Sequence, residues 1–167
     1  DIPDEPRRII SLVPSMTELL FDLNLEEQLR GRTRFCIHPR EKVDKVPVVG
    51  GVMGLNHHQI EKIQPDLVLA SKEENAKGEI LELSRNFPVW VSDVYNLKDA
   101  LSMIQNIGSI CKRNEKALAM TKQIEEAFTS LDHIPENVVR TVYVIWQNPF
   151  YTVNKNTFAH DMLKKCG

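Results

Sequence analysis

The segment Phe35-Cys36-Ile37-His38-Pro39 places a thiol and an imidazole two residues apart. In an extended segment, residues at this spacing face the same side, so we expect Cys36 and His38 to present their side chains together. Thiolate sulfur and imidazole nitrogen are ligands for soft or borderline metals, and histidine is also an axial ligand of haem iron. Two residues do not complete a metal site. The alternative is that His38 is a hydrogen-bonded loop residue before a proline.

The turn Pro14-Ser15-Met16 is a second candidate site, because it joins a strand-like apolar run to a helical pattern. Ser15 and Glu18 have the types and spacing of a capping box. A strand, turn and helix of this kind leave free N–H groups and the positive end of the helix dipole at the carboxyl edge of the strand. The turn has no nucleophile paired with a base and no glycine-rich phosphate loop. It therefore indicates ligand binding rather than catalysis.

Residues 50–54 contain three glycines, and Gly51 and Met53 are candidates for ligand contact. Glycine allows close backbone approach to a flat or bulky ligand, although turn geometry alone also explains such a cluster. The adjacent His57 and His58 would point about 100° apart on a helix, so we do not expect them to bind one metal.

Aromatic residues form a further candidate group, made of Trp90, Trp146, Phe150 and Tyr151. Together they would provide a wall for a planar ligand. Trp90 alternates within a predicted strand, where a core position is the alternative. Trp146 and Tyr151 flank the turn Asn148-Pro149, which makes them the stronger pair.

The composition is that of a folded protein, with 167 residues, 42% hydrophobic and 26% charged, enough for one domain or two small lobes. With a net charge of −2, the chain lacks the excess of positive charge that binding to nucleic acid or an anionic membrane would require. Three widely spaced cysteines imply neither a closed disulfide framework nor a zinc pattern. We expect most of them to be small buried residues.

Strand-like and helix-like segments alternate through the first ninety residues. Strands are predicted at 8–13, 29–33, 66–70 and 89–92, and helices at 15–23, 56–63 and 77–86. This alternation predicts βαβ units around a parallel sheet.

A helical pattern follows from residue 96, with apolar residues spaced three and four apart. Asn96 and Asn114 are candidate helix caps, which predicts two helices with a break at 108–114. The second helix, 115–131, would be about 25 Å long, enough to link two lobes. A strand at 138–146 and a helix at 158–166 complete the pattern.

We therefore predict an α/β fold with three parts: a Rossmann-like parallel-sheet lobe at 1–95, a helical connector at 96–134, and the start of a second α/β lobe at 135–167. One strand and one helix do not form a core on their own. We expect a missing segment to complete this lobe. The alternative is that it packs on the first lobe or on another copy.

Six segments resemble, in this order, the helical-backbone class (class III) of substrate-binding proteins of ABC importers. They are RIISLVPSMTELLFDL, GRTRFCIHP, VPVVGGVMGLN, IEKIQPDLVLA, PVWVSDV and NPFYTVNKNTFAHDML. The most specific part is S-x-x-P-S-x-T-E followed by I-x-x-I-x-P-D-L-V. This class includes vitamin B12-binding, ferric-siderophore and haem receptors. The resemblance implies two α/β lobes bridged by a long helix, with the ligand in a cleft between them.

The resemblance also implies roles for particular residues. It places the turn Pro14-Ser15-Met16 on the cleft, although Ser15 as a helix cap alone is an equal alternative. His38 falls where the B12-binding protein presents an aromatic residue to its ligand. Trp146 and Tyr151 flank a turn at the head of the second-lobe strand, and in relatives this turn faces the cleft.

Docking to a membrane permease is implied for the loop after the third strand. In relatives, an acidic residue here meets a permease arginine. The matching position in this chain is Lys77, so we assign docking to its neighbours Glu73 and Glu74, with Glu79 also close. A solvated charged face is the alternative.

The predicted function is capture of cobalamin, haem or a ferric siderophore and delivery to an ABC permease, with no intrinsic cofactor. The resemblance implies a periplasmic or extracytoplasmic location and is compatible with a membrane anchor. No signal segment is present in these residues.

Two other functions remain as alternatives. A metal-ion receptor would need three or four convergent ligands, for which His38, Glu18 and Asp93 are the available set. A metal-cluster enzyme on the same scaffold would need convergent cysteines. The three cysteines of this chain, Cys36, Cys111 and Cys166, lie in dissimilar contexts.

Overall fold

A computed structural model describes residues 2–51, 54–131 and 140–166. The chain divides into two compact units. Unit 1 comprises Asp1–Asp93 and Ile107–Arg113, and unit 2 comprises Val94–Asn106 and Asn114–Gly167.

Unit 1 is built on a four-stranded parallel sheet with the order β2-β1-β3-β4. The strands are β1 (Ile9–Ser11), β2 (Leu29–Arg32), β3 (Leu67–Ser71) and β4 (Val89–Ser92). The helices are α1 (Pro14–Asp22), α2 (Arg40–Val43), α3 (His57–Ile63) and α4 (Lys77–Leu83). The predicted parallel α/β sheet is therefore confirmed. The one-turn helix α2 was not predicted.

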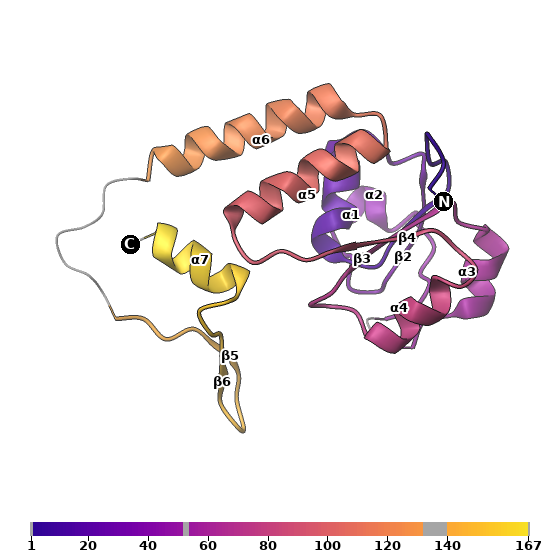
Figure 1. Cartoon of the computed structure of the whole chain (residues 1–167). Coiled ribbons are helices and arrows are strands. Elements are labelled where there is room, and N and C mark those ends of the chain that lie inside the picture. Colours follow the sequence, from indigo (N-terminus) through magenta and orange to yellow (C-terminus); the bar gives the residue numbers. More distant parts are fainter. Residues whose placement is uncertain (1, 52–53, 132–139, 167) are drawn as a thin grey trace. The chain divides into compact units, whose positions relative to one another are not determined.

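The sheet of unit 1 is covered on both faces, with α1 on one side and α3 and α4 on the other (Figure 1). Alternate strand residues, Ile10 and Val68 among them, join Ile60 of α3 and Leu83 of α4 in one buried cluster. All of β1 is buried. Strands buried on both faces read as continuous apolar runs, which explains the sequence of β3.

Two helices follow the sheet, α5 (Leu97–Ile110) and α6 (Asn114–Thr129). The predicted cap at Asn96 is confirmed, because its Oδ1 accepts a hydrogen bond from the Asp99 N–H at 2.9 Å. The predicted break falls at residues 111–113, where Lys112 has a positive φ of 55°. With 16 residues, α6 is about 24 Å long. Asn114 begins this helix rather than preceding it.

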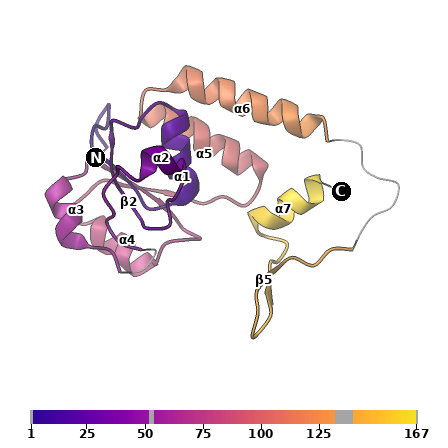
Figure 2. The ribbon, with the colours of Figure 1, turned by 180° about the vertical axis from the view of Figure 1, so that it is seen from behind.

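Unit 2 also contains a short antiparallel hairpin and a final helix, which Figure 1 labels as β5, β6 and α7, and Figure 2 shows β5 and α7 from behind. The hairpin pairs β5 (Val144–Trp146) with β6 (Tyr151–Thr152), and the helix is α7 (Phe158–Lys165). The predicted strand at 138–146 is too long: 138–139 lie outside the described residues, and 140–143 are not in a strand. The pairing with β6 joins Val144 to Thr152 and Trp146 to Tyr151, and β5 has three residues. Within the described ranges, no helix combines the length and apolarity needed to cross a membrane.

Candidate functional site

The candidate site of unit 1 lies at the carboxyl edge of its sheet. All four strands run parallel, so the loops that follow them share one edge, and ligands of open α/β sheets bind at this edge. The loops contain the turn after β1, residues 33–39 after β2, residues 72–75 after β3, and Asp93 after β4. Each of these loops holds at least one residue predicted from the sequence, namely Ser15, His38, Glu73 and Asp93.

Side-chain contacts link these loops to one another. Asn75 Nδ2 donates a hydrogen bond to the Leu12 carbonyl at 3.4 Å, which joins the loops after β3 and β1. Lys72 Nζ lies 2.6 Å from Asp93 Oδ2, which joins the loops after β3 and β4. Between the loop after β2 and strand β1, Cys36 Sγ lies 4.0 Å from the Ser11 carbonyl. The four loops therefore form one connected edge.

The turn after β1 begins α1 one residue earlier than predicted, and the capping box is wrong. Val13 is the N-cap, it makes no side-chain cap bond, and Pro14 is the first helical residue. Proline is favoured there because its φ is preset for a helix and its missing N–H is not needed. This places Ser15 inside the first turn, where its hydroxyl no longer occupies the cap position.

The three residues of this turn differ in exposure. Ser15 is exposed and Pro14 is half-buried, whereas Met16 is only 1% exposed and its side chain belongs to the core. Side-chain contact with a ligand is therefore open to Pro14 and Ser15. The first-turn N–H groups of Ser15 and Met16 have no acceptor within a regular helix.

A buried group of oxygens fixes this turn. Thr17 Oγ1 lies 2.8 Å from Ser11 Oγ and 3.0 Å from the Val13 carbonyl, and Ser11 Oγ lies 3.1 Å from the same carbonyl. Both side chains are fully buried. This network was not predicted, although a serine within an apolar strand and a threonine shortly after it are a signal for it in the sequence.

In the loop after β2, Cys36 and His38 do not share a face, contrary to prediction. Cys36 is 1% exposed, whereas His38 is exposed. The segment turns instead of extending, because the Cys36 N–H donates to the Thr33 carbonyl at 3.2 Å. The Cys36 thiol then lies 3.3 Å from Thr33 Oγ1 in the interior. Of the two side chains, Cys36 and His38, only the imidazole of His38 faces solvent.

Two apolar side chains of the same loop were missed. Phe35 is 48% exposed and Ile37 is 57% exposed, and the Arg34 guanidinium lies over the Phe35 ring at 5.5 Å. Exposed apolar residues beside a cation and an imidazole suit a partly apolar ligand that carries acidic or metal-binding groups. Residues alternate between apolar and metal-binding types in this segment. The prediction took Cys36 and His38 as the ligand-facing pair and left out Phe35 and Ile37.

The glycine segment is explained by its own turn. Gly50 has a φ of 132°, and a Cβ there would lie 2.7 Å from the Gly54 carbonyl oxygen and 2.8 Å from the Leu55 Cα. Glu79 Oε1 accepts from the Gly54 N–H at 2.7 Å, which holds the turn against α4. Gly51 is buried. Met53, another predicted ligand contact, lies outside the described residues.

The loop after β3 carries Glu73 and Glu74, the predicted docking pair, and both are exposed. The Ser71 N–H donates to Asn75 Oδ1 at 2.8 Å, and the Glu73 N–H donates to Ser71 Oγ at 3.2 Å. Desolvation by surrounding protein raises the pKa of the Glu74 carboxyl above its ordinary value, and the charge of Glu73 raises it further. Docking through this pair stays a prediction.

In unit 2, the hairpin brings Trp146 and Tyr151 together. They are paired across β5 and β6, and side chains directly opposite in an antiparallel pair lie on one face. Trp146 is 63% exposed, Tyr151 is 56% exposed, and the adjacent Phe150 is 73% exposed. Trp90, the remaining candidate, is half-buried in β4 of unit 1.

A metal-ion site of three protein ligands is not assembled by the described part of the chain. Nowhere within residues 2–51, 54–131 and 140–166 do three His, Cys, Asp or Glu side chains gather as metal ligands would. The set His38, Glu18 and Asp93 therefore finds no support. Cys111 is buried, and burial raises the pKa of its thiol to about 11. The thiolate needed for metal binding is thus disfavoured.

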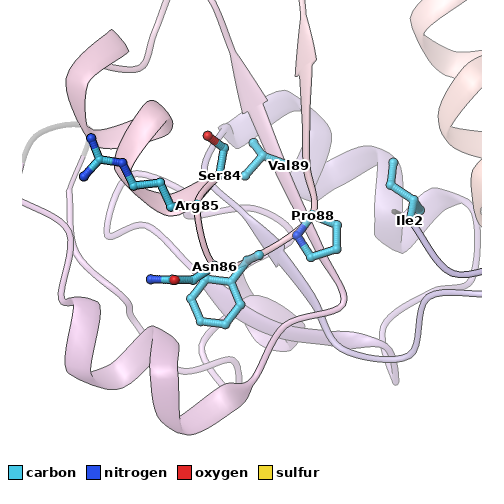
Figure 3. Close-up of a pocket in the computed structure, with 7 residues that line it drawn as sticks. Ile2, Ser84, Arg85, Asn86, Pro88 and Val89 are labelled. Carbon is cyan, nitrogen blue, oxygen red and sulfur yellow. The ribbon is translucent and has the colours of Figure 1, made fainter.

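A hollow of about 560 Å³ lies at the opposite end of the sheet (Figure 3). It is formed by Ile2 and by residues 84–89, which connect α4 to β4. In the close-up, the Arg85 guanidinium points away from Pro88 and Ile2. Since residues 84–89 precede the body of β4, this hollow is not part of the carboxyl edge.

The fold is that of class III periplasmic binding proteins. The structure of the periplasmic vitamin B12 binding protein BtuF of Vibrio cholerae superposes with a TM-score of 0.85 at 21% identity, over 99% of this chain and 66% of that one. A possible iron-binding periplasmic protein from Staphylococcus epidermidis gives a TM-score of 0.81 at 25% identity, over 97% and 66%.

The chain belongs to the periplasmic binding protein family, whose sequence profile matches residues 9–165. An uncharacterized ABC transporter substrate-binding lipoprotein, YvrC of Bacillus subtilis, is 28% identical over 97% of this chain and 54% of its own length. The vitamin B12-binding protein of Pectobacterium atrosepticum is 25% identical over 97% and 61%. The chain thus spans just over half of the length of these curated relatives.

Proposed function

We propose that this chain is part of the substrate-binding component of an ABC importer, and that its cargo is cobalamin or a related metal chelate such as haem or a ferric siderophore. The observation that carries the proposal is the family match over residues 9–165. Proteins similar to this chain include one named for vitamin B12 binding and one named as an ABC transporter substrate-binding lipoprotein. The function is binding and delivery, with no bond made or broken.

The carboxyl edge of unit 1 supplies groups suited to such a cargo. Phe35 and Ile37 offer apolar surface, His38 offers a metal-binding imidazole, and Ser15 offers a hydroxyl. The hairpin of unit 2 adds the exposed pair Trp146 and Tyr151. The position of the cargo relative to the two units stays a prediction from the family resemblance.

The location and the partner follow from the same proposal. We expect an extracytoplasmic protein that meets a membrane permease, and the name lipoprotein carried by the Bacillus subtilis relative favours a lipid anchor on the mature protein. Glu73 and Glu74 are the proposed contact with the permease, since both are exposed on one loop. Replacing both with glutamine should weaken stimulation of the permease ATPase and leave cargo affinity unchanged.

The test of the cargo is an equilibrium titration of the full-length mature protein with cyanocobalamin, hemin and ferric desferrioxamine B, followed by absorbance. Saturable binding of one probe identifies the cargo class. His38→Ala should remove any change in the metal's spectrum, whereas His58→Ala, which alters an exposed histidine of α3, should not. If none of the three probes binds, capture of these chelates is wrong.

A further inference from the structure

Arg32, at the end of β2, is a buried cation with no role in the site described so far. It is 8% exposed, and a guanidinium removed from water needs hydrogen-bond acceptors. Its Nε donates to the Val43 carbonyl at 2.9 Å, and its Nη1 donates to the Cys36 carbonyl at 3.0 Å and the Thr33 carbonyl at 3.3 Å. Asp44 adds a weaker ionic contact at 3.6 Å.

These contacts hold both ends of one segment, residues 36–43, which we call the His38 segment. The segment begins at the buried Cys36 and ends at the buried Val43, and the two carbonyls bound by Arg32 belong to these end residues. Ile37 and His38, which lie between them, are exposed. Arg32 therefore holds both ends of the segment from the protein interior, while the middle of the segment faces solvent.

The exposed middle of the segment has little packing of its own to hold it. Ile37 is 57% exposed, so burial of its side chain contributes little order. A segment whose side chains face water keeps its conformation mainly through its backbone contacts. The planar fork of Arg32 reaches carbonyls in different directions, which the single ammonium of a lysine does not reproduce.

We propose that Arg32 is a positioning residue that preorganises the His38 segment for cargo binding. The inference rests on the proposed function, because it takes the exposed side chains of this segment as cargo contacts. Arg32 does not touch the cargo. It keeps the segment in its binding conformation before the cargo arrives, so that less ordering is needed on binding.

The experiment compares Arg32→Met and Arg32→Lys with the control Arg30→Met in the full-length mature protein. Arg30 lies on the same strand and is exposed. Hydrogen exchange is measured at the backbone N–H groups of residues 36–38 and 40–43. These include the Cys36 N–H, bonded to the Thr33 carbonyl, and the Val43 N–H, bonded to the Pro39 carbonyl. Binding of cyanocobalamin, hemin and ferric desferrioxamine B is measured in parallel. Arg32→Lys keeps the charge and most of the buried stem if Arg32→Met does not fold.

In both Arg32 variants, we expect these amides to exchange at least about tenfold faster without cargo, since charged hydrogen bonds have been lost. The affinity for the probe that the wild type binds should fall by about tenfold, mainly through slower association, because a smaller fraction of the protein is ready to bind. Saturating probe should restore the lost protection, which a merely structural role would not produce.

Unchanged exchange in the Arg32 variants would overturn the inference, as would a loss of affinity no larger than that of Arg30→Met. If the wild type binds none of the probes, the proposed cargo is wrong, and exchange alone then decides the positioning role. Faster exchange in the Arg32 variants would still support the positioning role of Arg32 on the His38 segment, and unchanged exchange would reject it.

Discussion

The two units use their apolar strand residues in opposite ways. In unit 1, Ile10 of β1 and Leu69 of β3 are fully buried. In unit 2, Ile145 and Trp146 of β5 are 55% and 63% exposed, and every residue of β5 and β6 is exposed. Helices cover both faces of the sheet in unit 1, whereas a hairpin of two short strands has too few neighbours to build a core.

This difference separates stability from surface chemistry. The buried sheet of unit 1 should set the free energy of unfolding, while the described hairpin of unit 2 should contribute recognition surface and little stability. The carboxyl edge of unit 1 has both a stabilising part and a recognition surface, since its loops follow buried strands and carry exposed side chains.

Removing a buried leucine from unit 1 should be far more damaging than removing an exposed one from unit 2. Leu69→Ala leaves a cavity in the middle of the sheet and should reduce the free energy of unfolding by about 2–5 kcal/mol. Leu118→Ala, at a position 61% exposed on α6, should change it by less than about 0.5 kcal/mol. Urea unfolding followed by circular dichroism measures both. Similar losses would contradict the division.

The buried threonines of the two units should also differ. Thr17→Val removes a hydroxyl from the network with Ser11 and Val13, and should cost about 1–3 kcal/mol because buried oxygens lose a partner. Thr121→Val removes a hydroxyl that contacts the Leu118 carbonyl and Gln105, both bonds only partly buried. This change should cost less than Thr17→Val in the same unfolding experiment. Equal costs would mean that burial of the network is unimportant.

A smaller effect is expected at the N-terminus of α5. Asp161 of α7 accepts a hydrogen bond from the Leu97 N–H at 2.8 Å, so it caps a helix 64 residues away in sequence. Asp161→Ala should cost about 0.5–2 kcal/mol locally and accelerate hydrogen exchange of the Leu97 amide. Lys164→Ala, on the same helix and exposed, is the control. Normal protection of Leu97 in Asp161→Ala would show that the cap is not formed in solution.

The smallest effect concerns pH and Glu74. Its folded pKa lies above the ordinary value of 4.5, so ionising this carboxyl destabilises the folded state as the pH rises through the window above 4.5. Glu74→Gln should therefore raise the melting temperature slightly at pH 7 and leave it unchanged below the ordinary pKa. Glu73→Gln should give a smaller gain, because its charge is the second cause. If Glu74→Gln instead lowered the melting temperature at pH 7, the Glu74 carboxylate would be stabilising, and this account of its raised pKa would be rejected.

Much of the fold could be predicted because its signals are local. The apolar run before Ser71 predicted β3, because a strand buried on both faces is a continuous run of apolar residues. Asn96 predicted the start of α5, because a capping side chain lies next to the helix that it caps. The strand predicted to end at Trp146 was too long because its length depends on a partner elsewhere in the chain.

The candidate site was predicted less well, because its geometry depends on distant contacts. Val13 caps α1 because Pro14 can begin a helix, so Ser15 was assigned the wrong position. Cys36 points inward because Thr33 and Arg32 hold its backbone, and nothing in the spacing of Cys36 and His38 indicates this. Trp146 and Tyr151 were predicted to flank the turn Asn148-Pro149, which is a local signal, but the strand β6 that pairs them was not predicted.

The placement of the two tryptophans makes the protein its own optical reporter. The chain has only two indoles, and they fall one in each unit: Trp90 is half-buried in β4, and Trp146 is largely exposed on β5. Trp90 should emit at shorter wavelength and resist aqueous quenchers, whereas Trp146 should emit as an indole in water and be quenched readily. Single Trp→Phe variants would then let fluorescence follow each unit separately during unfolding or cargo binding, without any added label.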